Sequence, residues 1–217
     1  MGYEGNVTVG GPADTRELSD LTITKVAVGA FDNNAYLLRC RATGEQLLID
    51  AAAEPETLLA LIGESLAAVV TTHQHGDHWQ ALAEVDAATG AVTYAGEFDV
   101  EGIPTATQVA VADGDVVRFG QVELKAIHLV GHTPGSIALL YDDPQGHPHL
   151  FTGDCLFPGG VGNTQKDPER FATLLGDVSE KVFDRLPDET WIYPGHGKDT
   201  TLGAERPHLE EWRARGW

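Results

Sequence analysis

The stretch that decides how this chain folds is LAAVVTTHQHGDH, residues 66–78. Its first half is an apolar run, which is typical of a buried strand when polar residues bound it. Its second half places His73, His75, Asp77 and His78 within six positions, and clustered histidine and aspartate usually bind metal. Side chains at a strand end are held by a rigid scaffold while they face a cleft. We therefore expect a metal site here rather than a polar loop.

Three further candidate ligands lie in glycine-containing turns, each after an expected strand. They are His132 in GHTPG (131–135), Asp154 in TGDC (152–155) and His196 in PGHG (194–197). Glycine lets the backbone turn tightly and brings a short side chain close to an ion. Any one of these residues alone is more often solvated than ligating. Together with the first motif they make five histidines and two aspartates, which suffices for two metal ions that share one bridging carboxylate.

In these motifs the chain resembles the metallo-β-lactamase superfamily, and within it the glyoxalase II-like hydrolases. The matching stretches follow the family's order and cover most of the chain: 32–38, 48–50, 73–78, 131–136, 151–157 and 193–197. The resemblance implies one metal on His73, His75 and His132. It implies a second metal on Asp77, His78 and His196, with Asp154 between the two ions. Asp50 would lie behind the ligands, orienting them and setting their basicity.

The pattern of strands and helices predicts an α+β fold. Strands are expected over 22–30, 36–40, 47–50, 68–72, 92–94, 116–119, 122–130, 137–141, 149–152 and 190–193. Helices are expected over 56–65, after the metal motif, and from Pro168, where apolar residues recur at helical spacing. The family resemblance implies that these elements form a four-layer αββα sandwich. We expect one domain over 1–217, with residues 1–20 as a partly ordered tail.

The net charge of the chain indicates which classes of binding partner are disfavoured. The formal net charge is −19, which argues against nucleic acid, and membrane-surface binding is similarly disfavoured. No export signal or long apolar run is evident, so we expect a cytoplasmic protein that acts on a small molecule, with a homodimer left open. The two cysteines are expected to be reduced, with Cys155 in a packing role. The remaining histidines, His128, His147, His149 and His208, match no motif and are expected at the surface or satisfied in the core.

The ligand set predicts hydrolysis. Two divalent ions about 3.5 to 4 Å apart lower the pKa of a shared water, and the bridging hydroxide is then the nucleophile. Asp77 and Asp154 are the expected catalytic carboxylates. A thiol has a pKa of about 8.5 and leaves without a proton donor, which favours a thioester over an amide. Zinc is the first choice of metal, with iron or manganese as alternatives.

The chain departs from glyoxalase II in two places. Only about 20 residues follow His196, so the helical region that grips glutathione in those enzymes is expected to be missing. The usual arginine-containing loop is replaced by PGGVGNT, residues 158–164, where Asn163 and Thr164 are candidate substrate contacts. Glutathione specificity is therefore not expected.

Several alternatives share parts of the pattern. Persulfide dioxygenases resemble this fold and hold one iron with the equivalents of His73, His132 and Asp154. Lactonases share all seven ligands, whereas true β-lactamases usually have cysteine or serine in place of Asp154. A non-catalytic metal-binding protein would need a filled coordination sphere, and catalytic sites keep one position open.

Overall fold

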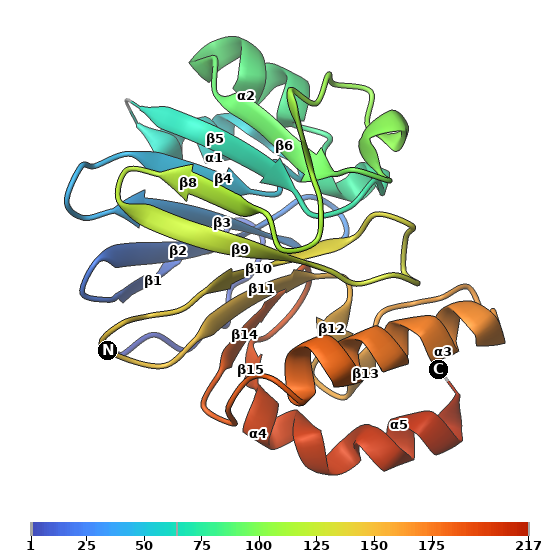
Figure 1. Ribbon diagram of the computed structural model, residues 1–217. Coiled ribbons are helices and arrows are strands. Elements are labelled where there is room, and N and C mark those ends of the chain that lie inside the picture. The colour runs from blue at the N-terminus through green and yellow to red at the C-terminus, as the bar shows by residue number, and fades with distance from the viewer. Residues whose placement is uncertain (1, 64, 217) are drawn as a thin grey trace.

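Apolar and alternating segments build two β-sheets in the computed structural model, which describes residues 2–63 and 65–216 (Figure 1). The first sheet has seven strands in the order β1-β2-β3-β4-β5-β6-β7. Their bounds are β1 Asp14–Glu17, β2 Leu21–Val28, β3 Asn33–Cys40, β4 Gln46–Ile49, β5 Leu66–Thr71, β6 Val92–Gly96 and β7 Val109–Val111. Strands β1 to β4 pair antiparallel, and β4 to β7 pair parallel.

The second sheet has six strands in the order β15-β14-β11-β10-β9-β8. These are β8 Val116–Phe119, β9 Val122–His128, β10 Ile137–Tyr141, β11 His149–Gly153, β14 Trp191–Pro194 and β15 Thr200–Thr201. Strands β12 (Leu156–Phe157) and β13 (Gly160–Val161) form a separate short hairpin. Strands β11 and β14 run parallel, so the loops that follow them leave the same edge of the sheet.

Helices cover the outer face of each sheet (Figure 1). Helices α1 (Pro55–Ile62) and α2 (Leu82–Thr89) pack on the first sheet, and α3 (Pro168–Asp177), α4 (Leu202–Glu205) and α5 (Leu209–Arg215) lie beside the second. Short 3₁₀ turns are η1 (Gly76–His78), η2 (Val100–Gly102) and η4 (Arg206–His208), and η3 (Val178–Phe183) is a π-helical continuation of α3. Asp167 caps α3 by accepting from the backbone N–H groups of Glu169 and Arg170.

Three apolar layers result from this arrangement. One cluster lies between the two sheets and includes Leu38, Leu124 and Phe151. A second lies under α1 and α2, and a third, which includes Phe171 and Trp212, lies under α3 to α5. Two sheets packed face to face with helices outside form the αββα sandwich, so the predicted fold class is confirmed.

Part of the segment expected as a partly ordered tail over residues 1–20 contacts the two sheets. Strand β1 pairs with β2, and the Tyr3 hydroxyl donates to Asp199 at 2.7 Å while its ring packs on Trp191. Residue 1 of that tail, residue 64 of the helix expected over 56–65, and residue 217 lie outside the described residues. Among the helices of the described ranges, none combines the length and apolar character that crossing a membrane requires.

Candidate metal centre

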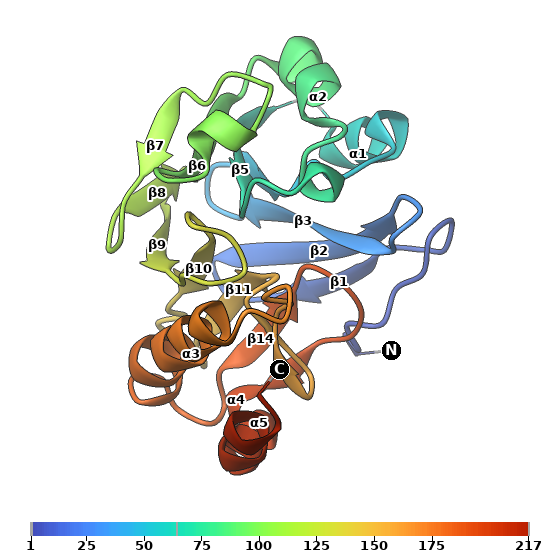
Figure 2. The same ribbon diagram turned by 90° about the vertical axis from the view of Figure 1, so that its right-hand side faces the viewer.

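All seven candidate ligands follow strand ends on one edge of the sandwich, the edge that faces the viewer in Figure 2. His73 and His75 follow β5, and Asp77 and His78 lie in η1. His132 lies in the loop after β9, Asp154 follows β11 and His196 follows β14. Both sheets therefore contribute side chains to one site.

The first group is formed by three histidines whose ligand atoms lie within 4.8 Å of one another. The Nδ1 atom of His75 lies 2.9 Å from Nε2 of His132, which lies 3.3 Å from Nε2 of His73. His73 and His132 are buried, whereas His75 is half-buried. This is the set predicted for the first metal.

The second group contains Asp77, His78 and His196. Nε2 of His196 lies 3.4 Å from Oδ2 of Asp77, and Nε2 of His78 lies 3.6 Å from the same oxygen. Asp154 lies between the two groups, since its Oδ2 is 3.6 Å from His132 Nε2 and 3.5 Å from His196 Nε2. The structure thus brings all seven predicted residues together.

Groups outside the centre orient four of the histidines through the second ring nitrogen. Nδ1 of His73 lies 3.0 Å from Thr72 Oγ1, and Nδ1 of His78 lies 2.8 Å from Asp50 Oδ2. Nδ1 of His132 lies 2.8 Å from the Asn163 carbonyl, and Nδ1 of His196 lies 2.9 Å from the Phe31 carbonyl. Each such contact fixes a tautomer and points Nε2 inward, as in known metal sites.

The donor set fits divalent cations. Asp154 Oδ1 is buried and has no hydrogen-bond partner among the described residues, and His78 Nε2 lies 3.4 Å away. Burial acts to raise the pKa of Asp154, but contacts with His196 and His78 outweigh it and hold that pKa well below its usual range. An ionised carboxylate with an unsatisfied oxygen, surrounded by imidazoles, is suited to bridge two cations.

Burial also affects the pKa of the histidines. It lowers the pKa of His73 well below its ordinary value, with neighbouring His78 acting in the same direction. For His78 burial acts the same way, but Asp50 and Asp154 outweigh it and raise the pKa to about 10. A bound cation would displace that proton, because a ligating imidazole must be neutral.

Asp50 lies next to His78, on the side away from the other candidate ligands. Its Oδ1 accepts from the backbone N–H of Thr72 at 2.7 Å, and its Oδ2 accepts from the Thr72 hydroxyl at 2.8 Å. Since Oδ2 also contacts His78, one carboxylate connects the strand end to a candidate ligand. Its φ of 59° is a left-handed value that non-glycine residues adopt rarely, and such strain is typical of functional sites.

Two residues at the centre were not singled out from the sequence. The Asn33 amide donates to Asp77 Oδ2 at 2.9 Å and lies 3.3 Å from His78 Nε2. Buried Asp99 accepts from the backbone N–H of Gln74 and Gly135 and from the Thr133 hydroxyl, so it ties the two ligand loops together. Neither residue lies in a metal-binding pattern, although Asn33 falls within one of the matching stretches.

Asn163 and Thr164 line a cavity of about 650 Å³, and Asn163 also contacts the centre through its backbone. Their contact with substrate stays a prediction. The carbonyl of Asn163 holds His132, its side chain accepts from the Gln165 N–H, and Thr164 is buried. A cavity of about 450 Å³ opens next to His75 and His132, and its other lining residues are Gln74, Val130, Gly131, Thr133, Pro134, Gln165 and Arg170.

Among the residues expected to have structural roles, buried His149 differs from the expectation, because one of its ring nitrogens is not satisfied by any described residue. Cys155 is buried in the third apolar cluster, and burial raises the pKa of its thiol. His128 Nε2 donates to the Pro134 carbonyl at 2.7 Å, and His208 is exposed beside Glu211. His149 is buried and its Nδ1 contacts the Tyr193 hydroxyl at 2.9 Å, but its Nε2 has no partner in the described part of the chain.

Comparison with known proteins agrees with this site. The family model described as "Metallo-beta-lactamase superfamily" matches residues 28–196. A hydroxyacylglutathione hydrolase of Polaromonas sp. is 38% identical over 170 residues, which are 77% of this chain and 63% of that protein. The chain thus spans somewhat less than two thirds of that relative's length.

Two solved structures combine similar folds with higher sequence identity. ETHE1 from Myxococcus xanthus has a TM-score of 0.76 and 30% identity, covering 88% of this chain and 84% of that one. TTHA1623, crystallised in a di-iron-bound form, has a TM-score of 0.69 and 34% identity, covering 84% of this chain and 96% of that one. With its fold, its seven converging side chains and a family match across most of its length, the chain belongs to the metallo-β-lactamase superfamily.

Proposed function

We propose that this chain is a metal-dependent hydrolase with two divalent ions, and that it cleaves an S-acyl thiol. The observation that carries the proposal is the position of Asp154, whose two oxygens face His78 on one side and His132 and His196 on the other. A single tetrahedral metal needs three or four ligands, whereas seven converge here. Similarity to a hydroxyacylglutathione hydrolase and to a protein solved with two irons supports both parts of the proposal.

His73, His75 and His132 would hold one ion, Asp77, His78 and His196 the other, and Asp154 would bridge them. Zinc is our first choice, with iron or manganese as alternatives, because histidine and carboxylate ligands accept all three. When bound, the two ions would supply Lewis acidity and lower the pKa of an attacking water.

The chain's own carboxylates would position that water. Burial acts to raise the pKa of Asp77, but the Asn33 amide and His78 outweigh it and lower the pKa, so Asp77 is ionised near neutral pH. Its Oδ2 lies 3.4 Å from His196 Nε2 on a partly exposed side chain and would accept a hydrogen bond from the attacking water. Asp154 keeps the two ligand groups at a fixed separation.

The substrate class follows from the leaving group. A thiolate departs without a proton donor, whereas an amide nitrogen must be protonated, and the carboxylates at this centre have lowered pKa values. Asp77 and Asp154 are therefore poor proton donors to a leaving amine. The cavity beside His75 and His132 is of a size for the acyl group. A cytoplasmic location, a possible second copy of the chain and the absence of nucleic acid or membrane partners stay predictions.

The test measures thiol release and dissolved oxygen side by side. Protein loaded with zinc, iron or manganese is given S-lactoylglutathione, acetyl-coenzyme A and a persulfide in turn. We expect thiol release from at least one thioester, with no oxygen uptake. His196→Gln should abolish hydrolysis because it removes one of the three residues that would hold the second ion. His208→Gln, at an exposed histidine, is the matched control and should leave the rate unchanged.

An oxygenase gives the opposite pattern. A single iron on His73, His132 and Asp154 would consume oxygen with a persulfide, and His196→Gln would leave much of that activity. Oxygen uptake without thioesterase activity under any metal loading would refute the hydrolase proposal.

A further inference from the structure

A second cavity lies on the outer face of the second sheet, where its helical cover ends. Along β9 the side chains alternate, so Leu124 and Ala126 face the inter-sheet core while Lys125 and Ile127 face outward. Lys125 is the cross-strand partner of Leu140 on β10, and Leu140 packs against the outer cluster. The outer face therefore presents a cation and two aliphatic side chains next to one another.

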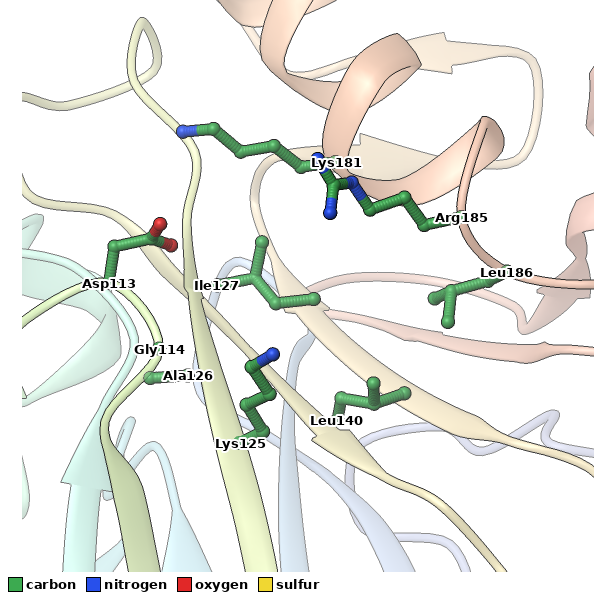
Figure 3. A pocket seen from close by; sticks show the side chains of 9 residues that line it. All are labelled: Asp113, Gly114, Lys125, Ala126, Ile127, Leu140, Lys181, Arg185 and Leu186. Carbon is green, nitrogen blue, oxygen red and sulfur yellow. The ribbon is translucent and has the colours of Figure 1, made fainter.

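The end of η3 closes this surface into a cavity of about 290 Å³. Its lining residues are Asp113, Gly114, Lys125, Ala126, Ile127, Leu140, Lys181, Arg185 and Leu186. None of them is a candidate metal ligand. Figure 3 shows the Lys125 and Arg185 side chains on opposite sides of Ile127, with Leu140 and Leu186 beside them.

Two of the cations at this cavity, Lys125 and Arg185, have no carboxylate partner among the described residues. Lys125 Nζ makes no hydrogen bond or ion pair with any residue the structure describes, and Arg185 uses only its Nε, which donates to the Glu180 carbonyl. Both side chains are exposed.

The other two charged lining residues are already engaged. Lys181 Nζ donates to the His128 carbonyl at 2.7 Å and pairs with Asp177 at 3.1 Å, and Figure 3 shows it extended away from Arg185. Asp113 Oδ1 accepts from the backbone N–H of His128 at 2.8 Å. Lys125 and Arg185 therefore remain as the groups free to bind a ligand.

We propose that this cavity binds an organic anion, namely a carboxylate carried on an apolar body. The terminal N–H groups of Arg185 can form two parallel bonds to a carboxylate, and Lys125 adds a second positive charge across the cavity. Ile127, Leu140 and Leu186 would cover the apolar part, which an inorganic anion lacks. The site is independent of the proposed hydrolysis.

Binding of hexanoate to metal-loaded protein, followed by calorimetry and ligand-observed NMR, tests the proposal. We expect hexanoate to bind saturably at this cavity, and hexanol and inorganic phosphate each to bind more weakly than hexanoate. The double variant Lys125→Gln with Arg185→Gln should weaken binding by about tenfold or more. Arg118→Gln is the matched control, since Arg118 is an exposed cation on the adjacent strand β8 that pairs with Glu123, and it should bind as the wild type does.

Leu186→Glu provides a second variant, because a carboxylate beside the aliphatic residues should repel the ligand without removing either cation. The proposal is overturned if hexanoate does not saturate, or if it binds the double variant as tightly as the wild type, which would place it elsewhere, such as the metal centre. Phosphate binding as tightly as hexanoate would refute the role of the aliphatic residues.

Discussion

The histidines of the candidate metal centre are oriented before any ion arrives. Four have their second ring nitrogen held by Thr72, Asp50, Asn163 or Phe31, so their rings need little rearrangement on metal binding. Asp154 is different, because its Oδ1 has no partner among the described residues. Asp154 should therefore depend on bound metal for its stabilisation more than Asp50 or any other residue behind the ligands does.

Asp154→Ala should abolish hydrolysis and weaken both metals, since it removes the carboxylate that would neutralise two closely spaced cations. Asp50→Ala should do less, because it alters the orientation of His78 without removing a ligand. Loss of such a partner typically costs about 10 to 100-fold in metal affinity or activity. Metal content and turnover of both variants measure the difference. Normal turnover with two ions in Asp154→Ala would contradict the bridging role.

His149 should make the protein less stable in mild acid. Burial lowers its pKa to about 3, with His147 and Arg16 acting in the same direction. Between an unfolded pKa of about 6.5 and that folded value, only the unfolded chain binds the proton, so stability falls as the pH falls. Its contribution to the loss should be about 2 kcal/mol at pH 5.

Urea unfolding of the wild type and of His149→Phe at pH 7 and pH 5 measures this effect. Phenylalanine fills a similar volume and does not titrate, so the variant should lose less stability on acidification. The comparison between the two proteins cancels any acid release of metal, which affects both. Equal losses in both proteins would show that His149 does not titrate as described.

Local motifs were enough to predict the seven residues that converge, because four lie in one histidine and aspartate motif and three lie in separate glycine-containing turns. Their role as ligands stays a prediction. Asn33 and Asp99 could not be predicted, since they act by contacts to residues distant in the sequence, 44 positions in the case of Asn33 and Asp77. Asn163 was predicted only as a substrate contact, which stays a prediction, and the contact of its backbone carbonyl with His132 had no sequence signal.

Strands and helices could be predicted where apolar residues formed a continuous or regularly spaced pattern along the sequence. The ten strands expected from the sequence all occur, because each carries a buried run or a clear alternation. Five strands were missed: β1, β7, β12, β13 and β15. Each is short and at least half of its residues are not buried, so pairing rather than sequence pattern defines these strands. The π-helical turn η3 also leaves no sequence signal, since its apolar spacing continues that of α3.

The turn after β14 should tolerate no side chain at Gly195. A Cβ atom there would lie 2.2 Å from Asp154 Oδ1 and 2.8 Å from His78 Cε1, so Gly195→Ala should displace the carboxylate between the ligand groups. We expect loss of metal and activity in a protein that still folds. Gly176→Ala is the matched control, because a Cβ in α3 meets open space there and should stabilise the helix by up to about 1 kcal/mol.

Metal analysis, turnover and circular dichroism of the two alanine variants provide the comparison. Full metal content in Gly195→Ala would mean that the turn can move without cost to the centre.

The whole molecule places its candidate metal centre where the two sheets meet. Residues 73–78 come from the first sheet's edge, whereas His132, Asp154 and His196 come from loops of the second. Besides the ligands, an isolated bridge between Asn33 and His196 and the Asn34 amide on the Pro194 carbonyl connect the same two halves. Ions bound here would therefore link the sheets as well as serve the chemistry.

Removing the metal should consequently lower the melting temperature of the entire chain. Ligand that binds only the folded state stabilises it by about 2.7 kcal/mol at a hundred times its dissociation constant. For a domain of this size that corresponds to roughly 5 to 10 °C. Thermal unfolding should be followed with chelator and with added zinc, together with elemental analysis that we expect to give two ions per chain. His196→Gln should retain one ion and only part of the increase, whereas His208→Gln should match the wild type. If the melting temperature did not change with chelator, bound metal would not link the sheets. If a fully loaded chain held one ion, the two ligand groups would not form a two-metal site.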